Sequence, residues 1–319
     1  MRAPRILFVK LSSLGDVVHH MPAVAELREH LPDAVIGWAV EEAYVPLVKL
    51  HPAVRDTIPV ALRALRQRPC DRILWQRLGA TRHALRAGDW DYVVDAQGLV
   101  KSAMVARLAR GRVTIGPGFR SAREGAAAIL YDVRVPVERS MHAVERNRHL
   151  VGEAFGYRPE GPAHYDLAGP AAPPLWAPRG AYAVLLHAAS RANKRWPESN
   201  WIGLAQRLSR QGFATVFPGG TEEERIAAAR LALMVPGAMA APAMNVAGAA
   251  ALIAHAALVA GVDTGLTHLA VALGRPTVGI YCATRPELTG LHGEEGTNLG
   301  GPGESPGVSQ VARALGFPA

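Results

Sequence analysis

Polar side chains stand in loops of the sequence where an apolar run stops and a helical pattern starts. In residues 11–17, Asp16 follows Ser12 and Gly15. A carboxylate in such a loop can take a proton from a hydroxyl group, as a general base does. It can equally cap the helix that follows, as an N-cap residue does. The sequence leaves both roles of Asp16 open.

A second loop, residues 262–268, combines Asp263, Thr264, Gly265 and His268. Glycine lets a ligand approach the backbone closely, and the N-terminus of a helix favours an anion. A diphosphate would fit this position, with His268 donating to one of its oxygens. The alternative is an Asp or Thr cap beside a half-buried histidine.

Two further loops could serve the same kind of ligand. Residues 187–197 hold a hydroxyl at Ser190 and three cations, among them Lys194, which suit an anionic leaving group. In residues 219–224, two glycines precede three glutamates, one of which could accept hydrogen bonds from ribose hydroxyls. The alternative for residues 187–197 is a solvated loop without a ligand. The alternative for residues 219–224 is the ordinary start of a helix.

The elements that must position these loops alternate between strand and helix. Apolar runs are expected to form strands at 5–10, 35–40, 57–60, 92–97, 113–116, 181–187, 213–220, 257–263 and 276–281. Helical patterns lie between them, the first over 17–31, and after residue 284 only one short helix near 308–315 is expected. Such alternation predicts parallel sheets covered on both faces. Ligands then bind beyond the carboxyl ends of the strands, in a cleft expected between the two halves.

Positive charge is concentrated in the first half of the chain. Residues 1–160 hold 24 basic and 17 acidic residues, and residues 55–123 hold 14 basic and 5 acidic ones. Most of the cations are Arg, which suits bidentate contacts to phosphate or carboxylate. Aromatic residues are only 6% of the chain and no RRM, KH or helix-turn-helix pattern is found, so a polyphosphorylated or acidic small substrate is favoured over nucleic acid.

Several classes of protein are excluded by missing patterns. The loops match neither GxGxxG nor GxxxxGK[ST], which argues against a dehydrogenase or a P-loop NTPase. No Glu-x-x-His or His-x-x-x-His pair occurs in a useful place, so no metal site is expected. Cys70 and Cys282 stand alone and far apart, which fits a reducing cytoplasm. No apolar stretch is long enough for a transmembrane helix.

Taken together, these segments resemble the lipopolysaccharide heptosyltransferases over nearly the whole chain. The motifs that carry the resemblance keep one order and spacing: 9–23 (VKLSSLGDVVHHMPA), 39–42 (AVEE), 58–63 (IPVALR), 95–103 (DAQGLVKSA), 142–146 (HAVER), 194–198 (KRWPE), 222–225 (EEER) and 262–269 (VDTGLTHL). Segments 95–103 and 142–146 are more similar to the type I enzymes than to type II.

The resemblance implies an α/β fold of the GT-B class, in which two Rossmann-like domains with parallel sheets face a central cleft. The domains would be an acceptor-binding domain at 1–165, a linker at 166–180 and a nucleotide-sugar-binding domain at 181–319. The implied reaction is an inverting, metal-independent transfer of L-glycero-D-manno-heptose, without a cofactor. The donor would be ADP-L-glycero-D-manno-heptose and the acceptor the Kdo of Kdo-lipid A, in synthesis of the lipopolysaccharide inner core.

The resemblance also assigns residue roles. Asp16 matches the general base, and Lys194 matches a catalytic residue beside the leaving diphosphate. The donor-binding positions are Ser190, Glu222, Met244, Asp263, Thr264, Gly265 and His268. The acceptor-binding positions are Ser12, Gly15, Arg63, Arg66, Lys101, Arg123 and Arg146.

The resemblance implies a cytoplasmic monomer in peripheral contact with the cytoplasmic face of the inner membrane, without nucleic acid as a partner. Two alternatives stay open. The first is heptosyltransferase II or another GT-B transferase with a different donor or acceptor. The second is a non-enzymatic protein that binds nucleotides or nucleic acid.

Overall fold

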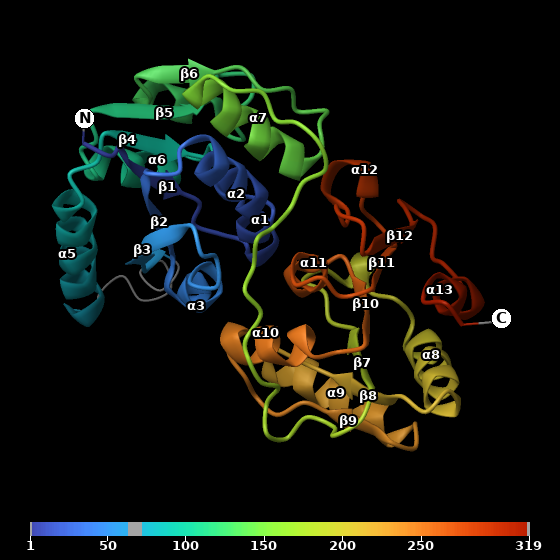
Figure 1. Cartoon of the computed structure of the whole chain (residues 1–319). Coiled ribbons are helices and arrows are strands. Elements are labelled where there is room, and N and C mark those ends of the chain that lie inside the picture. The colour runs from blue at the N-terminus through green and yellow to red at the C-terminus, as the bar shows by residue number, and fades with distance from the viewer. Residues whose placement is uncertain (1, 63–71, 318–319) are drawn as a thin grey trace. The chain divides into compact units, whose positions relative to one another are not determined.

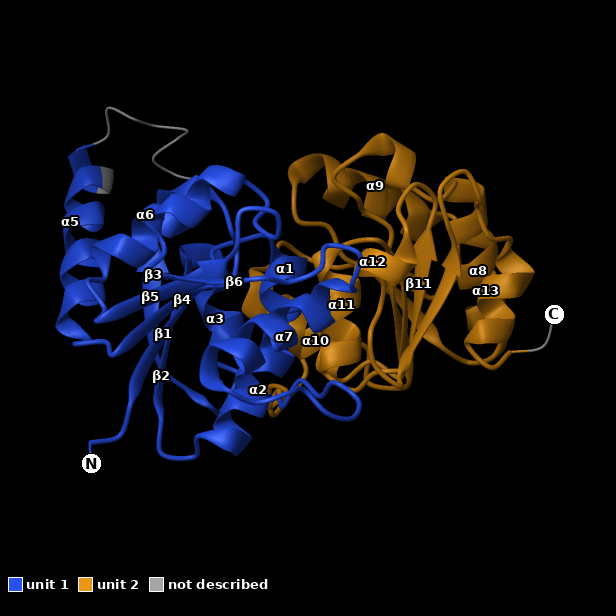
Figure 2. Ribbon diagram, turned by 90° about the horizontal axis from the view of Figure 1, so that it is seen from above, with its two compact units in different colours: residues 1–166 blue, residues 167–319 orange. Residues whose placement is uncertain are grey.

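The computed structural model describes residues 2–62 and 72–317 (Figure 1). The chain divides into two units, Met1–Asp166 and Leu167–Ala319, each with a sheet of its own (Figure 2). The segment expected as a linker, 166–180, belongs to the second unit apart from its first residue.

Unit 1 contains a six-stranded parallel sheet in the order β3-β2-β1-β4-β5-β6. Its strands are β1 (Arg5–Val9), β2 (Val35–Glu41), β3 (Val54–Val60), β4 (Tyr92–Asp95), β5 (Val113–Pro117) and β6 (Val133–Val135). Its α-helices are α1 (Leu14–Val18), α2 (Met21–His30), α3 (Val45–Val48), α5 (Arg72–Ala87), α6 (Val100–Leu108) and α7 (Ala143–Phe155). The short helical turns η1 (Glu42–Tyr44) and η2 (Gly125–Leu130) complete the part of the unit that the structure describes.

Unit 2 repeats this topology with the order β12-β11-β10-β7-β8-β9. Its strands are β7 (Tyr182–Leu186), β8 (Ala214–Phe217), β9 (Ala238–Ala240), β10 (Leu258–Val262), β11 (Thr277–Tyr281) and β12 (Gly296–Gly300). Its helices are η3 (Ala192–Lys194), α8 (Glu198–Arg210), α9 (Glu222–Leu233), α10 (Val246–Ala254), α11 (Gly265–Ala272), α12 (Pro286–Thr289) and α13 (Val308–Ala314). Counted within each unit, both sheets have the Rossmann strand order 3-2-1-4-5-6, which confirms the expected fold class.

The central strands are apolar along their whole length because helices cover both faces of each sheet. In unit 1, Leu7 and Val9 of β1 share a core with Leu85 of α5 and Val105 of α6. Phe8 points to the opposite face, where its ring contacts the His20 ring just before α2. So α5 and α6 cover one face of this sheet and α2 lies on the other.

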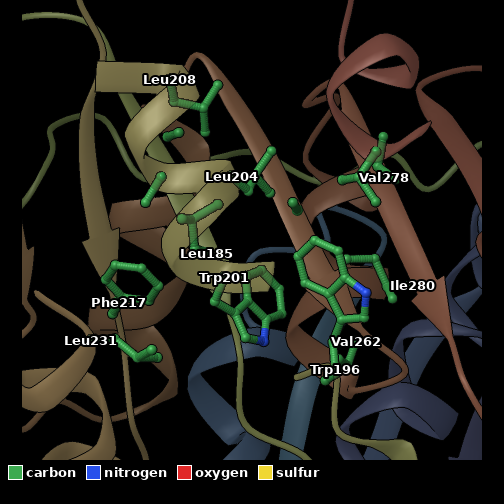
Figure 3. Close-up of a cluster of buried hydrophobic side chains, with 14 of the residues drawn as sticks. Leu185, Trp196, Trp201, Leu204, Leu208, Phe217, Leu231, Val262, Val278 and Ile280 are labelled. Carbon is green, nitrogen blue, oxygen red and sulfur yellow. The ribbon is translucent and has the colours of Figure 1, made fainter. Parts of the chain in front are cut away.

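The core of unit 2 is built around two indole rings (Figure 3). Trp196 and Trp201 meet edge to face with their ring centroids 4.9 Å apart. Trp196 also donates a hydrogen bond to the Pro306 carbonyl at 2.8 Å. This packing anchors the chain directly after the basic loop and fixes the start of α8.

Two expectations about the elements are wrong. The helix expected over 17–31 is two helices, because α1 ends at Val18 and α2 begins at Met21, with Pro22 in its first turn. The sequence analysis also missed β6, β9 and β12, which all lie at sheet edges. An edge strand has one neighbour and little buried surface, so its sequence carries no long apolar run.

Candidate active site

The loop after β1 places Asp16 in the first turn of α1. Ser13 is the N-cap residue of this helix. The Asp16 carboxylate accepts hydrogen bonds from the Ser13 N–H at 3.0 Å and from its hydroxyl at 3.1 Å. Asp16 therefore stands at the third helical position and not at the N-cap, where the sequence pattern placed it. The hydrogen bonds from Ser13 end on Oδ2, so Asp16 caps the helix and still keeps Oδ1 for another partner.

That partner is Arg123, which forms an ion pair with Asp16. Only 16% of the Asp16 side chain is exposed. Burial by itself would raise the pKa of Asp16, but the positive charges of Lys10 and Arg123 and the hydrogen bond from the Ser13 N–H outweigh it, so the pKa lies below its usual value. Asp16 is ionised at neutral pH.

Lys10 is a buried cation that the sequence analysis did not assign to the site. Its ammonium donates to the Ala96 carbonyl at 2.6 Å and to Oδ1 of Asn147 at 3.2 Å. Burial lowers the pKa of Lys10 to about 8, although the nearby Asp16 charge acts in the opposite direction. The signal in the sequence is a lysine that ends a buried strand directly before the Ser-Ser loop.

Gln97 ties the same loop to the end of β4. Its Oε1 accepts the Leu11 N–H at 2.7 Å, and its Nε2 donates to the Ser12 carbonyl at 2.7 Å. Gln97 is itself held by Asp95, which accepts its N–H at 2.8 Å. The following Gly98 has φ +69°, a conformation that suits glycine and lets the chain turn tightly around the Asp95 carboxylate.

Asp95 is fully buried below the loop. It accepts hydrogen bonds from the Tyr131 hydroxyl at 2.7 Å and from the Ser102 hydroxyl at 2.8 Å. Burial raises the pKa of Asp95 despite these hydrogen bonds. The carboxylate has no access to a substrate, so its role is to hold the Gln97 turn.

These residues line a pocket of about 360 Å³ at the carboxyl ends of β1, β4 and β5. Its charged and amide side chains are Lys10, Asp16, Gln97, Arg123, Arg139, Arg146 and Asn147. The pKa of Arg146 is lowered, first by burial and then by the positive charge of Arg123. Four cations around one carboxylate make this pocket suited to an anion.

The structure brings together only part of the expected acceptor set. Arg123 and Arg146 line the pocket with Asp16. Ser12 lies in the same loop and its carbonyl is bonded to Gln97, while Gly15 is in the first turn of α1. Lys101 is exposed on α6 and does not line the pocket. Arg63 and Arg66 lie outside the described residues.

In unit 2, the Asp263 carboxylate at the end of β10 contacts three side chains. The Lys194 ammonium donates to its Oδ2 at 2.6 Å, and the Thr284 hydroxyl donates to the same oxygen at 2.7 Å. Nε2 of His268 lies 3.5 Å from Oδ1. Burial would raise the pKa of Asp263, but the hydrogen bonds from His268, Lys194 and Thr284 outweigh it and hold the pKa far below its usual value. Thr284 was not among the expected site residues.

Asp263 also precedes the N-terminus of α11. Thr264 is the N-cap residue and Gly265 the first residue of the helix, so its first backbone N–H groups have no helical partner. His268 belongs to the first turn, where it is buried. The Lys194 ammonium and the N-terminus of α11 thus both lie next to Asp263, which is an arrangement suited to a phosphate group.

The other expected donor residues lie in other segments of unit 2. Glu222 begins α9, is largely exposed and pairs with Arg225. Ser190 lines a separate pocket of about 530 Å³ with His187 and Trp196. Met244 stands directly before Asn245, the N-cap residue of α10. The structure therefore brings Lys194, Thr284 and His268 to Asp263 beside the N-terminus of α11.

Two features are absent from the described residues. No group of three or more His, Cys, Asp or Glu side chains in this part of the chain is placed to hold a metal ion. None of the helices described is both long enough and apolar enough to cross a membrane.

The model of glycosyltransferase family 9 (heptosyltransferase) matches residues 78–314 of the chain. The chain is 39% identical to lipopolysaccharide heptosyltransferase 1 of Escherichia coli K12 over 292 residues, which cover 91% of each chain. The solved structure of E. coli heptosyltransferase WaaC with ADP has a TM-score of 0.88, 37% identity and 98% coverage of both chains. WaaC with ADP-2-deoxy-2-fluoro heptose gives a TM-score of 0.83 at the same identity and coverage.

These similarities extend over both units. They confirm the GT-B fold class and the expected enzyme class, a glycosyltransferase. The chain belongs to glycosyltransferase family 9, the heptosyltransferases.

Proposed function

We propose that the enzyme transfers L-glycero-D-manno-heptose from ADP-L-glycero-D-manno-heptose to the Kdo of Kdo-lipid A in synthesis of the lipopolysaccharide inner core. Support comes from the E. coli relative, a lipopolysaccharide heptosyltransferase 1, and from the similar structures with ADP and a fluorinated ADP-heptose. The observation that carries the proposal is an ionised Asp16 in a pocket lined by cations. This pocket pairs a base with a site for an acidic acceptor.

We assign the acceptor to unit 1. The carboxylate of Kdo and the phosphates of lipid A are anionic, and Arg123, Arg139 and Arg146 offer guanidinium groups that can bind them in a bidentate manner. Lys10 is held by Ala96 and Asn147 and contributes a fixed positive charge.

We assign the donor to unit 2. Lys194 is held beside the N-terminus of α11 by its hydrogen bond to Asp263. In this position its charge and the helix N–H groups can both stabilise a diphosphate. Glu222 and Met244 are proposed to contact the ribose and the adenine, and Ser190 the diphosphate.

The reaction needs one base and stabilisation of one leaving group. As the Kdo hydroxyl oxygen bonds to the anomeric carbon of the heptose, the bond from that carbon to the diphosphate oxygen breaks. The electron pair leaves with ADP, and the hydroxyl proton passes to Asp16. Attack from the face opposite the diphosphate inverts the anomeric centre. Lys194 and the N-terminus of α11 counter the charge that grows on the diphosphate.

The ion pair with Arg123 couples acceptor binding to the strength of the base. While Arg123 contacts Asp16, the pKa of Asp16 is held down and its proton affinity is small. An acceptor carboxylate that pairs with Arg123 offsets part of this positive charge. The proton affinity of Asp16 then rises when the acceptor is in place.

The location of the reaction follows from its two substrates. A nucleotide sugar is a cytoplasmic donor, and lipid A is anchored in a bilayer by its acyl chains. We therefore place the enzyme at the cytoplasmic face of the inner membrane, in peripheral contact with it. We also propose that the enzyme is a monomer.

The deciding experiment is incubation with ADP-heptose and Kdo-lipid A, followed by mass measurement of the lipid. The proposal predicts a gain of one heptose. A heptosylated acceptor serves as the comparison, because a type II enzyme would extend that lipid and leave Kdo-lipid A unchanged. Absence of any gain on Kdo-lipid A would refute the proposal.

The assignment of acceptor and donor to the two units has its own test. Replacing Arg63 and Arg66 by Ala should raise the KM for the acceptor and leave the affinity for ADP-heptose nearly unchanged. Arg179→Ala in unit 2, where Arg179 is exposed, is a control for the removal of an Arg side chain. If the affinity for ADP-heptose falls instead, the two assignments are wrong.

A further inference from the structure

Helix α5 presents a stripe that is both basic and aromatic. Arg72, Trp75, Arg82 and Arg86 follow one another at spacings of three, seven and four residues, so they lie on one side of the helix. Trp75 is 57% exposed, and Arg72 and Arg82 are exposed as well. The helix is anchored by Leu85, which is buried in the core of unit 1.

Helix α6 continues this surface. Arg86 donates from Nε to the Leu108 carbonyl at 3.4 Å, which joins the stripe to the end of α6. Met104 is 57% exposed on α6, and Leu108 is also exposed. Figure 2 shows the two helices next to each other in unit 1. We call this surface the α5–α6 face, and its residues are Arg72, Trp75, Arg82, Arg86, Met104, Leu108 and Arg110.

The cations of this face are crowded and lack acidic neighbours on their own helices. Neither α5 nor α6 contains an Asp or Glu. Burial lowers the pKa of Arg86 first, and the charges of Arg110 and Arg82 lower it further. Among the described residues, the Asp132 carboxylate pairs with Arg107, which does not belong to this face. A like-charged cluster of this kind is stabilised by an external anion.

We propose that the α5–α6 face docks the enzyme on the surface of an anionic lipid bilayer. The Arg side chains would contact lipid phosphates, and Trp75, Met104 and Leu108 would enter the headgroup region. Tryptophan prefers this depth, and a basic helix with exposed apolar residues binds in the plane of the interface.

The apolar residues favour a bilayer over nucleic acid. Nucleic-acid surfaces combine cations with several stacking aromatic rings. Trp75 is the one aromatic ring of the α5–α6 face, and the exposed Met104 and Leu108 gain nothing from a phosphate backbone. In a bilayer, all three side chains leave water. The inference deepens the proposed function, because a lipid-linked acceptor lies in such a bilayer, but vesicle binding can be measured without any transfer.

The test is co-sedimentation with vesicles. The wild-type enzyme should bind vesicles that contain phosphatidylglycerol, release them as salt rises, and bind pure phosphatidylcholine vesicles weakly. Each Arg near an anionic surface contributes about fivefold to partitioning. The double variant Trp75→Ser/Arg82→Gln should therefore lose about tenfold or more. Its thermal midpoint should stay unchanged because both side chains are exposed.

The matched control removes one apolar side chain and one Arg side chain from a different surface. Leu233→Ser/Arg210→Gln deletes an exposed apolar residue and an exposed Arg from unit 2, and it should partition like the wild type. Equal partitioning of the Trp75/Arg82 variant and the wild type would overturn the proposal. So would wild-type binding to single-stranded RNA that exceeds vesicle binding and is lost in the same variant.

Transfer assays separate this inference from the proposed function. On a deacylated, water-soluble Kdo acceptor, the Trp75/Arg82 variant should turn over like the wild type. On Kdo-lipid A in vesicles, it should be slower. If the wild type transfers no heptose but the vesicle results hold, the proposed function fails and the docking surface stands.

Discussion

Asp16 and Arg123 form an ion pair although 107 positions of sequence separate them. Asp16 comes from the first turn of α1 and Arg123 from the loop after β5. Both loops lie at the carboxyl ends of the parallel strands, where the strand order brings them together. The same carboxylate thus receives a helix-capping contact from Ser13 and a charge contact from Arg123, and the two roles can be separated by mutation.

Asp16→Asn should keep the fold and lose the activity. An Asn side chain can still accept the hydrogen bonds from Ser13, so the thermal midpoint should change little. It cannot act as a base, and loss of a positioned base costs about 10²–10⁴-fold in rate. We expect normal affinity for ADP-heptose and turnover lower by at least about a hundredfold.

Glu224→Gln is the matched control for this change. Glu224 has the same place in α9 that Asp16 has in α1, because its carboxylate accepts the N–H of the N-cap residue Thr221 at 3.1 Å. It should have a similar small effect on the thermal midpoint and none on turnover. Near-full activity of Asp16→Asn would mean that Asp16 only caps α1.

Because of Lys10, the free energy of unfolding should change with pH in the alkaline range. Its pKa is lowered from 10.5 to about 8. Below pH 8 the amine is protonated in the folded and unfolded chains, so the cost of burying its charge is present in full. Between pH 8 and 10.5 the unfolded chain binds more protons, and the folded state gains stability as pH rises. Relative to Lys10→Met, the wild type should gain about 3 kcal/mol in free energy of unfolding across this range.

Urea unfolding at pH 7.5 and pH 10.5 measures this difference. Lys49→Met is the control, because the Lys49 side chain is exposed and stays hydrated in both states. Its difference from the wild type should not change with pH. A Lys10→Met difference that is equally constant would show that the Lys10 amine is not desolvated by folding.

Lys194→Ala should lower kcat more than it weakens donor binding. The charge on the diphosphate grows toward the transition state, so the Lys194 ammonium stabilises that state more than the bound donor. Removal of one such electrostatic contact costs about 10²–10³-fold in kcat. Arg191→Ala removes a cation three residues earlier in the same loop and should have a small effect. A higher KM with unchanged kcat would instead mean that Lys194 acts in ground-state binding.

Turnover should survive treatment with a strong chelator. In the part of the chain that the structure describes, no cluster of His, Cys, Asp or Glu is placed to hold a metal ion. Lys194 and the N-terminus of α11 are proposed to supply the positive charge that a divalent cation would otherwise bring. The measurement is the rate of heptose transfer in EDTA, with and without added Mg²⁺. A rate lost in EDTA and restored by Mg²⁺ would contradict this prediction.

Much of the fold could be predicted because its determinants are local. The central strands, such as β1 and β7, are buried along their length, so each forms one apolar run that is visible in sequence. The edge strands β6, β9 and β12 were missed for the same reason, since they bury less apolar surface. The break between α1 and α2 depends on Pro22 and on the burial of His20 against Phe8, and the second of these is a tertiary contact.

The candidate site divides in the same way. The sequence by itself determined that Asp16, Lys194 and Asp263 stand in loops between a strand and a helix, because apolar periodicity and glycine act over a few residues. Only the tertiary structure decided their partners, such as Arg123 for Asp16 and Thr284 for Asp263, and only it placed Lys10 beside Asn147. Each of these contacts joins residues far apart in the chain. They form because the parallel strand order of each sheet brings separate loops to the carboxyl ends of its strands. Burial there makes the pKa of each group depend on the charges beside it.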